Sequence, residues 1–319
     1  MNFTDIKTTR LLAMSLAAAT CLSSAVFAQE YKQEDEQLIP TFRPGENLSF
    51  EAGIDVTTAY FYRGISQGRQ NYTGAIIQPY ASLDLGLYDD ETVTVNGHIA
   101  TWNSFSTMNR PAGNNNAWYE SDIAIGFTIG LPKDNLALDV TYIWLENPQG
   151  GAEFNQEIDI SLAYDDSEFW STVAETKDIP GFEGFQPYAL LAYETSGAAD
   201  AIAEDSGVYL EFGIEPSMTL IDSKTLPITF SLPAHVGLNV SNYYQTAPGD
   251  DSDFFGYLDV GAKLSAPMTF IPKEYGNWDM YVGVDFLIFS DQLREISSAA
   301  GTGNSTVQVI GTFGMSMSF

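Results

Sequence analysis

The sequence has a single cysteine, Cys21, among its 319 residues. One cysteine forms no disulfide within the chain and cannot build a metal site from several thiolates. The stability of the fold must therefore come from packing, hydrogen bonds and its surroundings.

Basic residues are also scarce. Lys and Arg number 13 against 42 Asp and Glu, so the formal net charge is -29. A chain this acidic repels nucleic acid, and we expect no nucleic-acid partner. Charged residues make up only 17% and hydrophobic residues 45% of the sequence. This composition is too apolar for a disordered acidic chain, so the chain is expected to fold.

Long hydrophobic runs are missing beyond the N-terminus, and the mean hydropathy is -0.07. These features exclude a bundle of transmembrane helices. The one apolar run, residues 11–22, follows Lys7 and Arg10 and precedes small residues that end at Ala28. This arrangement is typical of a cleaved secretory signal peptide, which we assign to residues 1–28.

Cys21 leaves with this leader, because Ala18-Ala19-Thr20 before it fits a lipoprotein site poorly. Residues 29–46 are polar and acidic, and we interpret them as a periplasmic tail. The rest, residues 47–319, is predicted to be one domain. Whether the tail plugs this domain is left open by the sequence.

Residues 47–319 carry twelve long segments of period-two character. We place them at 48–62, 74–88, 92–103, 118–131, 135–146, 155–165, 184–195, 206–221, 226–240, 253–266, 277–289 and 305–319. Soluble strands usually have five or six residues, whereas tilted strands that cross a bilayer need about 9 to 11. We therefore predict an all-β fold, a transmembrane antiparallel up-and-down β-barrel of about twelve strands. Residues 166–183 are interpreted as an elaborated periplasmic connection, with a further short strand at 169–173 as the alternative. A count of fourteen strands stays open.

Alternation of side chains supports the barrel. In 135–146, Leu138 and Val140 share one face, and Asp139 and Thr141 share the other. A barrel in lipid needs apolar side chains outside and polar ones inside. A soluble sandwich alternates too, but the same pattern over twelve long segments favours the barrel.

The connections alternate between short and long. Residues 89–91, 132–134 and 222–224 are short, and the longer ones are 63–73, 104–117, 195–205, 241–252 and 290–304. Outer-membrane barrels have short periplasmic turns and longer extracellular loops. We therefore expect the long loops outside the cell and both termini in the periplasm.

Aromatic residues mark the ends of many predicted strands. Tyr60, Tyr62, Tyr88, Tyr119, Trp144, Tyr164 and Trp278 suit the girdles at the membrane surfaces. Trp102 falls on the inner face by parity, so it either follows a bulge or lines the lumen. The last strand ends on Phe319, which resembles the terminal signal of bacterial outer-membrane barrels.

Three motifs carry a family resemblance. They are Tyr60-Phe61-Tyr62-Arg63-Gly64-Ile65-Ser66-Gln67 followed by Gln78-Pro79-Tyr80, then Trp118-Tyr119-Glu120-Ser121-Asp122, and Gly256-Tyr257-Leu258-Asp259-Val260-Gly261. Together they resemble the TorF-like porin family of bacterial outer-membrane proteins over most of the mature chain. The resemblance implies a barrel with a channel role.

Strand parity collects the acidic residues on the inner face. The predicted pore-lining residues are Asp55, Asp84, Glu120, Asp122, Asp139, Asp159, Glu211, Asp259, Asp285 and Arg63, and Glu51, Glu157, Glu194, Glu215 and Asp279 share the face. Carboxylates that repel one another need water or cations around them, and acidic rings favour cations in pores. The sequence therefore predicts a porin-like channel for small cations or neutral solutes.

Arg63 ends the first segment. It is interpreted either as a constriction residue or anion contact, or as a girdle residue or ion-pair partner inside the lumen. The second interpretation is favoured, with Asp55 or Glu120 as the candidate partners. No metal site and no cofactor is predicted, because the acidic run 250–253 lacks the spacing of a calcium loop. Lipid and lipopolysaccharide are the expected surroundings, and an oligomer stays open.

Two other classes of function stay open. A non-conducting barrel would serve as a structural or adhesion element through its outer loops, its acids merely solvating a closed interior. A lipid-modifying enzyme would use His98 or His235, which both fall on the inner face. No G-x-S-x-G motif accompanies either histidine, so we expect no enzymatic activity.

Overall fold

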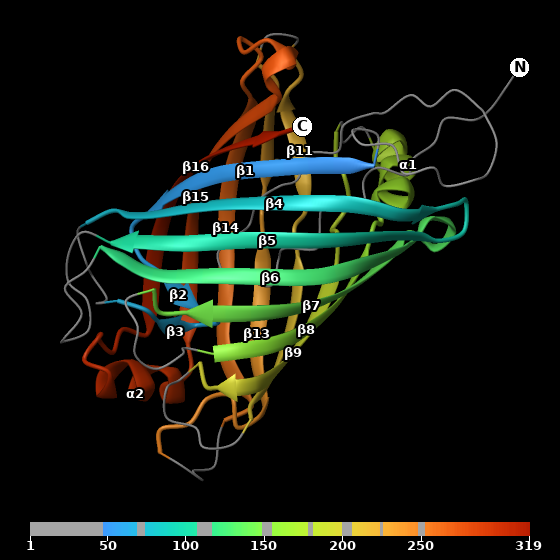
Figure 1. The fold of residues 1–319 in the computed structure, drawn as a ribbon. Helices are drawn as coiled ribbons and strands as arrows, with labels where there is room; N and C mark the ends of the chain where they lie inside the picture. Colours follow the sequence, from blue (N-terminus) through green and yellow to red (C-terminus); the bar gives the residue numbers. More distant parts are fainter. Residues whose placement is uncertain are drawn as a thin grey trace, which may run out of the picture.

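The structure is a computed structural model that describes residues 47–68, 74–106, 117–148, 155–177, 181–199, 206–223, 226–247 and 253–319. The predicted signal peptide and tail, residues 1–46, lie outside the described residues, as do Asp250, Asp251 and Ser252 of the acidic run. Within the described part, the chain forms an antiparallel barrel with both termini of the barrel domain at the same end (Figure 1).

Twelve strands close the barrel. They are β1 (Leu48–Thr57), β4 (Ile76–Asp89), β5 (Thr94–Ser106), β6 (Trp118–Leu131), β7 (Leu136–Glu146), β8 (Asn155–Tyr164), β9 (Tyr188–Gly197), β10 (Val208–Ile214), β13 (Ala234–Ser241), β14 (Phe255–Pro267), β15 (Asn277–Phe289) and β16 (Val307–Ser318). Each strand pairs with its neighbours in the barrel, and β1 pairs with both β4 and β16. The predicted twelve-strand barrel is confirmed.

Two further strands extend the wall. Segments 206–221 and 226–240 were each predicted as one strand, but β10 is followed by a separate β11 (Ser217–Ile221), and β12 (Ile228–Ser231) precedes β13. The breaks fall at Pro216 and Pro233, because proline has no N–H for the ladder. β11 and β12 pair with each other, and β12 also pairs with β14.

The two ends of the barrel differ. At the short-turn end lie the β4–β5 turn, η2 (Pro132–Asp134), η3 (Lys273–Tyr275) and α1 (Ser167–Lys177). The long-loop end carries a small hairpin of β2 (Phe61–Tyr62) and β3 (Ile65–Ser66) together with α2 (Asp291–Ala299). Figure 1 shows α1 and α2 toward opposite ends of the barrel.

Helix α1 settles the 166–183 segment. The alternative of a further strand there is wrong, because Ser167 to Lys177 are helical. Trp170 on this helix packs its ring 5.1 Å from that of Phe185 and 5.8 Å from that of Phe182. Asp166 before the helix accepts hydrogen bonds from the backbone N–H groups of Phe185 and Gln186. Residues 166–177 therefore form a docked helical part of the connection between β8 and β9.

The β4–β5 turn shows why the short connections are tight. Asp90 accepts hydrogen bonds from the backbone N–H groups of Thr92 and Val93, at 2.7 and 2.8 Å. The Tyr88 hydroxyl donates to the same carboxylate. The hydrogen bond from the Tyr88 hydroxyl contributes most, and the two backbone N–H groups add to it; together they hold the pKa of Asp90 below its usual value. The Asp90 carboxylate therefore keeps its negative charge in water.

The outer face of the barrel is apolar. On β6, Ile123, Ile125 and Phe127 are 50 to 55% exposed, whereas Asp122 and Thr128 on the other face are buried. Large hydrophobic side chains on the other strands repeat this pattern. Such an inverted arrangement is stable where lipid, not water, surrounds the wall.

A charge on this face tests the lipid contact. Ile125→Arg at the middle of β6 is expected to lower the free energy of unfolding by about 2–4 kcal/mol, the cost of a cationic side chain near the bilayer midplane. Urea unfolding in lipid vesicles, followed by gel mobility, measures the change. Phe270→Arg, at a 78% exposed position in the β14–β15 connection, is the matched control and should change little. Equal effects of the two variants would contradict a lipid-facing β6.

Tyrosine rings on the inner face cover glycines of neighbouring strands. A Cβ atom at Gly237 would overlap the Tyr257 ring, and one at Gly314 would overlap the Tyr281 ring. Glycine at these positions lets an aromatic ring lie against the backbone, a device that pins strand register. The inner face is thus lined by tyrosines as well as carboxylates.

Candidate functional site

A hairpin from the long-loop end is inserted into the barrel. We call residues 60–67 the mouth hairpin. β2 and β3 within it pair with each other, and in the part of the chain that the structure describes they pair with no barrel strand. Arg63 and Gly64 form its turn at φ values of 45° and 81°.

This hairpin corrects two predictions. The first strand is predicted to run from 48 to 62, but it ends at Thr57, and Phe61–Tyr62 belongs to the separate short strand β2. Tyr60 and Tyr62 were assigned to the membrane girdle, yet they are only 4% and 3% exposed. Parity within a strand carries no information on whether the next loop folds inward.

Arg63 is the centre of the site. Its guanidinium Nη2 lies 2.7 Å from Glu157 Oε2 and 2.8 Å from Asp159 Oδ2, both on β8. All three side chains are at least 98% buried. The prediction that Arg63 pairs with Asp55 or Glu120 is wrong, because the turn of the hairpin carries it across the interior to β8.

Tyrosines complete the cage around this guanidinium. Its carbon lies 4.8 Å from the ring centroid of Tyr209, 5.2 Å from that of Tyr62 and 5.6 Å from that of Tyr243. The hydroxyls of Tyr62 and Tyr243 donate to Glu157 at 2.9 and 2.8 Å. Such a desolvated cation over aromatic rings is strongly held.

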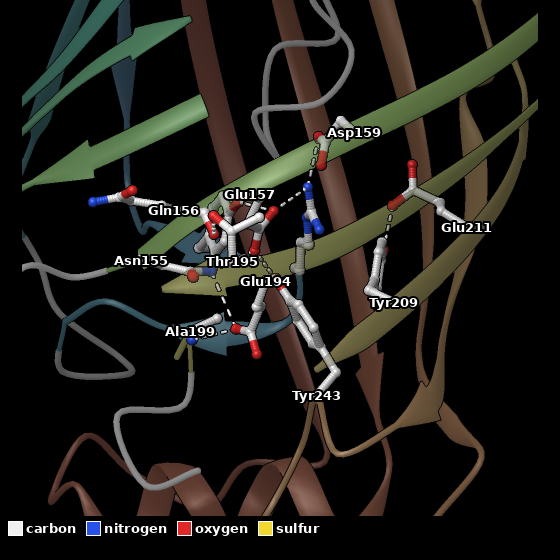
Figure 2. A network of polar contacts seen from close by, with 12 residues as sticks. Asn155, Gln156, Glu157, Asp159, Glu194, Thr195, Ala199, Tyr209, Glu211 and Tyr243 are labelled. Carbon is white, nitrogen blue, oxygen red and sulfur yellow. Dashed lines mark hydrogen bonds and ion pairs between the residues drawn. The ribbon is translucent and has the colours of Figure 1, made fainter. Parts of the chain in front are cut away.

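The network extends to β9 and β10 (Figure 2). Asn155 donates to Glu194 at 3.1 Å and also to Glu157. Glu194 in turn accepts the backbone N–H groups of Ala199 and Gly207, at 2.7 and 2.8 Å, on either side of the β9–β10 connection. One fully buried carboxylate therefore fixes the two ends of that connection against the site.

An apolar layer holds the other side of the hairpin. Phe61 and Ile65 pack in one buried cluster with Leu293 and Ile296 of α2. The Phe61 ring stacks 5.2 Å from that of Phe289. Ser290 caps the N-terminus of α2, since its hydroxyl accepts a hydrogen bond from the Leu293 N–H. The mouth hairpin is thus clamped between α2 and the β8–β10 wall.

The predicted pore-lining residues divide by burial. Those that are buried are Asp55, Glu120, Asp122, Asp139, Asp159, Glu211 and Arg63, and those that are half-buried are Asp84, Asp259 and Asp285. They form smaller groups around the interior that interact electrostatically, Asp122 with Glu157, Asp159 with Glu211, and Glu211 with Asp259. Glu120 and Asp122 neighbour Tyr60 of the mouth hairpin, whereas Asp55 accepts a hydrogen bond from Tyr281 far from it in sequence.

Two of these groups contain a histidine. His98 Nε2 lies 2.9 Å from Thr141 Oγ1, and its Nδ1 lies 3.7 Å from Asp139. His235 Nε2 lies 3.2 Å from the Tyr257 hydroxyl and 3.8 Å from Asp259. Both histidines are held as hydrogen-bonding partners of interior side chains. Trp102 also lines the interior, with its ring 5.0 Å from that of Tyr60.

Several residues of the site were not selected from the sequence. Glu157 and Glu194 share the predicted inner face but are not among the predicted pore-lining residues, and the sequence analysis gives Tyr209 and Tyr243 no role. Tyr257 belongs to a family motif but not to the predicted pore lining. Parity offered a signal for two of them, since Tyr209 and Tyr257 lie two residues before Glu211 and Asp259 on the same face. Tyr243 follows a strand and carried no such signal.

The described residues hold no group of three or more His, Cys, Asp or Glu side chains arranged to bind a metal ion.

In the described ranges, no helix is both long enough and apolar enough to cross a membrane.

A closed antiparallel barrel with an apolar outer face and a charged inner face defines an outer-membrane β-barrel. No protein-family model matches the sequence, and no curated protein matches it.

Solved structures of outer-membrane barrels resemble the fold. The NanC porin has a TM-score of 0.38 at 9% identity and covers 85% of this chain and 98% of its own. An outer membrane channel from Pseudomonas putida F1 has a TM-score of 0.40 at 10% identity, over 88% of this chain and 100% of its own. The β domain of the Bordetella autotransporter BrkA has a TM-score of 0.40 at 9% identity, over 86% and 99%. The likeness concerns the fold alone.

Proposed function

We propose that this protein is an outer-membrane diffusion channel for small cationic and neutral solutes, narrowed at its long-loop end by the mouth hairpin. In this proposal the short turns and α1 face the periplasm. The resemblance of its motifs to the TorF-like porin family supports the same role, and we propose that the chain is a member.

The observation that supports this proposal is the negative charge of the inner face. Eight strand carboxylates are at most 5% exposed, namely Asp55, Glu120, Asp122, Asp139, Glu157, Asp159, Glu194 and Glu211. Among the described residues, Arg63 and Lys263 are the buried Arg and Lys side chains. Acidic linings attract cations and repel anions in a narrow pore.

A second candidate is a non-conducting barrel that acts through its outer loops. The observation that favours it is the clamped mouth hairpin, because Phe61, Arg63 and Leu293 are each 1% exposed at the long-loop end. An enzymatic role has less support, since His98 and His235 each face a carboxylate and a hydroxyl of the interior.

Single-channel recording of the refolded mature protein under a KCl gradient separates the two. We expect a small, steady conductance with a reversal potential on the cation side, because the interior is negatively charged. Silence from a barrel whose fold is verified by heat-modifiable gel migration would reject the channel and favour the structural role.

Selectivity tests the lining itself. Asp159 binds Arg63, so the variant uses two other interior carboxylates. Asp84 is opposite His98 in the β4–β5 ladder, and Asp139 lies 3.7 Å from the same histidine. Asp84→Asn/Asp139→Asn is expected to reduce the cation preference while the barrel stays folded. Glu274→Gln is the control, because it also neutralises a carboxylate but at an exposed position in η3. It should leave the selectivity unaltered. Unchanged selectivity in the double variant would remove these residues from the conducting path.

A further inference from the structure

A second pair of carboxylates lies next to the mouth hairpin. Glu120 and Asp122 are two residues apart on β6, so both project from the same face of the strand. They are 2% and 5% exposed. Two like charges this close and this dry are unfavourable unless something compensates them.

No basic side chain in the described part of the chain compensates the pair. The buried arginine is engaged by Glu157 and Asp159, and Lys263 is engaged by Glu215. Glu120 accepts a hydrogen bond from Tyr60, and Asp122 accepts one from the backbone of Glu146. One oxygen of each carboxylate, Oε2 of Glu120 and Oδ1 of Asp122, is buried without a hydrogen-bond partner.

Aromatic side chains lie near this pair of carboxylates. Trp102 is opposite Asp122 in the β5–β6 ladder, and its ring is 5.0 Å from that of Tyr60, which neighbours both carboxylates. Tyr62 and Tyr80 lie in the same buried cluster. Carboxylates next to aromatic faces are the surroundings in which organic cations bind in proteins.

The same barrel shows what such a pair holds. Glu157 and Asp159 on β8 have the same spacing as Glu120 and Asp122, and the hydroxyls of Tyr62 and Tyr243 donate to Glu157. Their occupant is the guanidinium of Arg63, at 2.7 and 2.8 Å. The β6 pair has the chemical composition of the β8 cage without its cation.

We propose that Glu120 and Asp122 form a binding site for a small organic cation with a guanidinium or primary ammonium group. The cation donates to the two free carboxylate oxygens, and the Tyr60 and Trp102 rings flank it. The site lies beside the mouth hairpin, so a cation that enters the barrel meets it at the constriction. It adds a substrate class to the proposed channel, and its occupancy does not require conduction.

Isothermal titration calorimetry with methylguanidinium chloride tests the site on the folded protein in detergent, at constant ionic strength set with NaCl. We expect saturable binding to the parent protein. Glu120→Gln/Asp122→Asn should weaken it by about tenfold or more, since the charge-assisted hydrogen bonds are lost. Glu274→Gln is the control and should bind as the parent does. Equal affinity of the double variant would overturn the site.

Three other results would also overturn the proposal. Absence of binding to the parent would do so, as would saturable CaCl₂ binding that methylguanidinium does not displace. Binding that appears only in Arg69→Ala or Arg110→Ala would show that an arginine of this chain fills the site. If the double variant does not fold, a competition experiment on the parent protein takes its place. Displacement of methylguanidinium by methylammonium supports the site, and lack of displacement overturns it. The calorimetry is independent of conductance, so silent bilayer recordings would reject the channel and leave the binding result standing.

Discussion

Deleting the mouth hairpin is expected to raise the single-channel conductance several-fold. Removal of residues 60–67 joins Ala59 to Gly68 and leaves β1 and β4 connected by a loop of ordinary length. Phe61, Arg63 and Ile65 then no longer fill the long-loop end, and the acidic side chains behind them meet water. Because β2 and β3 pair with no described barrel strand, the deletion leaves the backbone hydrogen bonds between the barrel strands in place.

The measurement compares parent and deletion in the same planar bilayer and salt. Heat-modifiable gel migration checks that the deletion still forms a barrel. A matched control shortens a turn at the other end, for example by removal of Glu91, and should leave the conductance near that of the parent. An unchanged conductance after hairpin deletion would place the constriction elsewhere.

Replacing Arg63 with Met is expected to lower the free energy of unfolding by about 3–5 kcal/mol. The methionine fills part of the volume but leaves Glu157 and Asp159 buried without a cation. Removing one member of a buried ion pair is costly for this reason, whereas a neutral replacement of the whole group costs much less. Urea titration in vesicles, monitored by gel mobility, measures the loss.

Two comparisons make this result specific. Arg294→Met in α2 breaks an exposed pair with Asp291 and should cost at most about 1 kcal/mol. Adding Glu157→Gln and Asp159→Asn to Arg63→Met should recover much of the stability, because the uncompensated charges are gone. If Arg63→Met unfolds like Arg294→Met, the guanidinium does not stabilise the interior.

The strands of the wall were predictable because lipid and interior impose opposite demands on alternate residues. Segments 135–146 and 155–165 match β7 (Leu136–Glu146) and β8 (Asn155–Tyr164) almost residue for residue. The same parity placed acids such as Asp139 on the inner face. Prolines 216 and 233 carried the signal for the breaks in the wall, but the alternation continues across them and hides it.

The site itself was only partly predictable. Arg63 was recognised as an interior cation, but its partners come from β8, which is nearly a hundred residues away in sequence. Helix α2 was missed within the loop 290–304, although Ser290 followed by Leu293 and Ile296 has the spacing of a capped helix with one apolar face. Contacts between loops depend on the closed barrel, so a pattern along the chain cannot define them.

The seam between β1 and β16 has a consequence for biogenesis. The N–H of Gly311 donates to the Thr58 hydroxyl across 253 residues of sequence, and the two strands pair along most of their length. The entropic cost of joining such distant partners grows only logarithmically with their separation. Until the final strand arrives, however, β1 exposes a row of unpaired backbone groups that lipid cannot satisfy. We therefore expect the wall to enter the bilayer only after β16 has paired with β1.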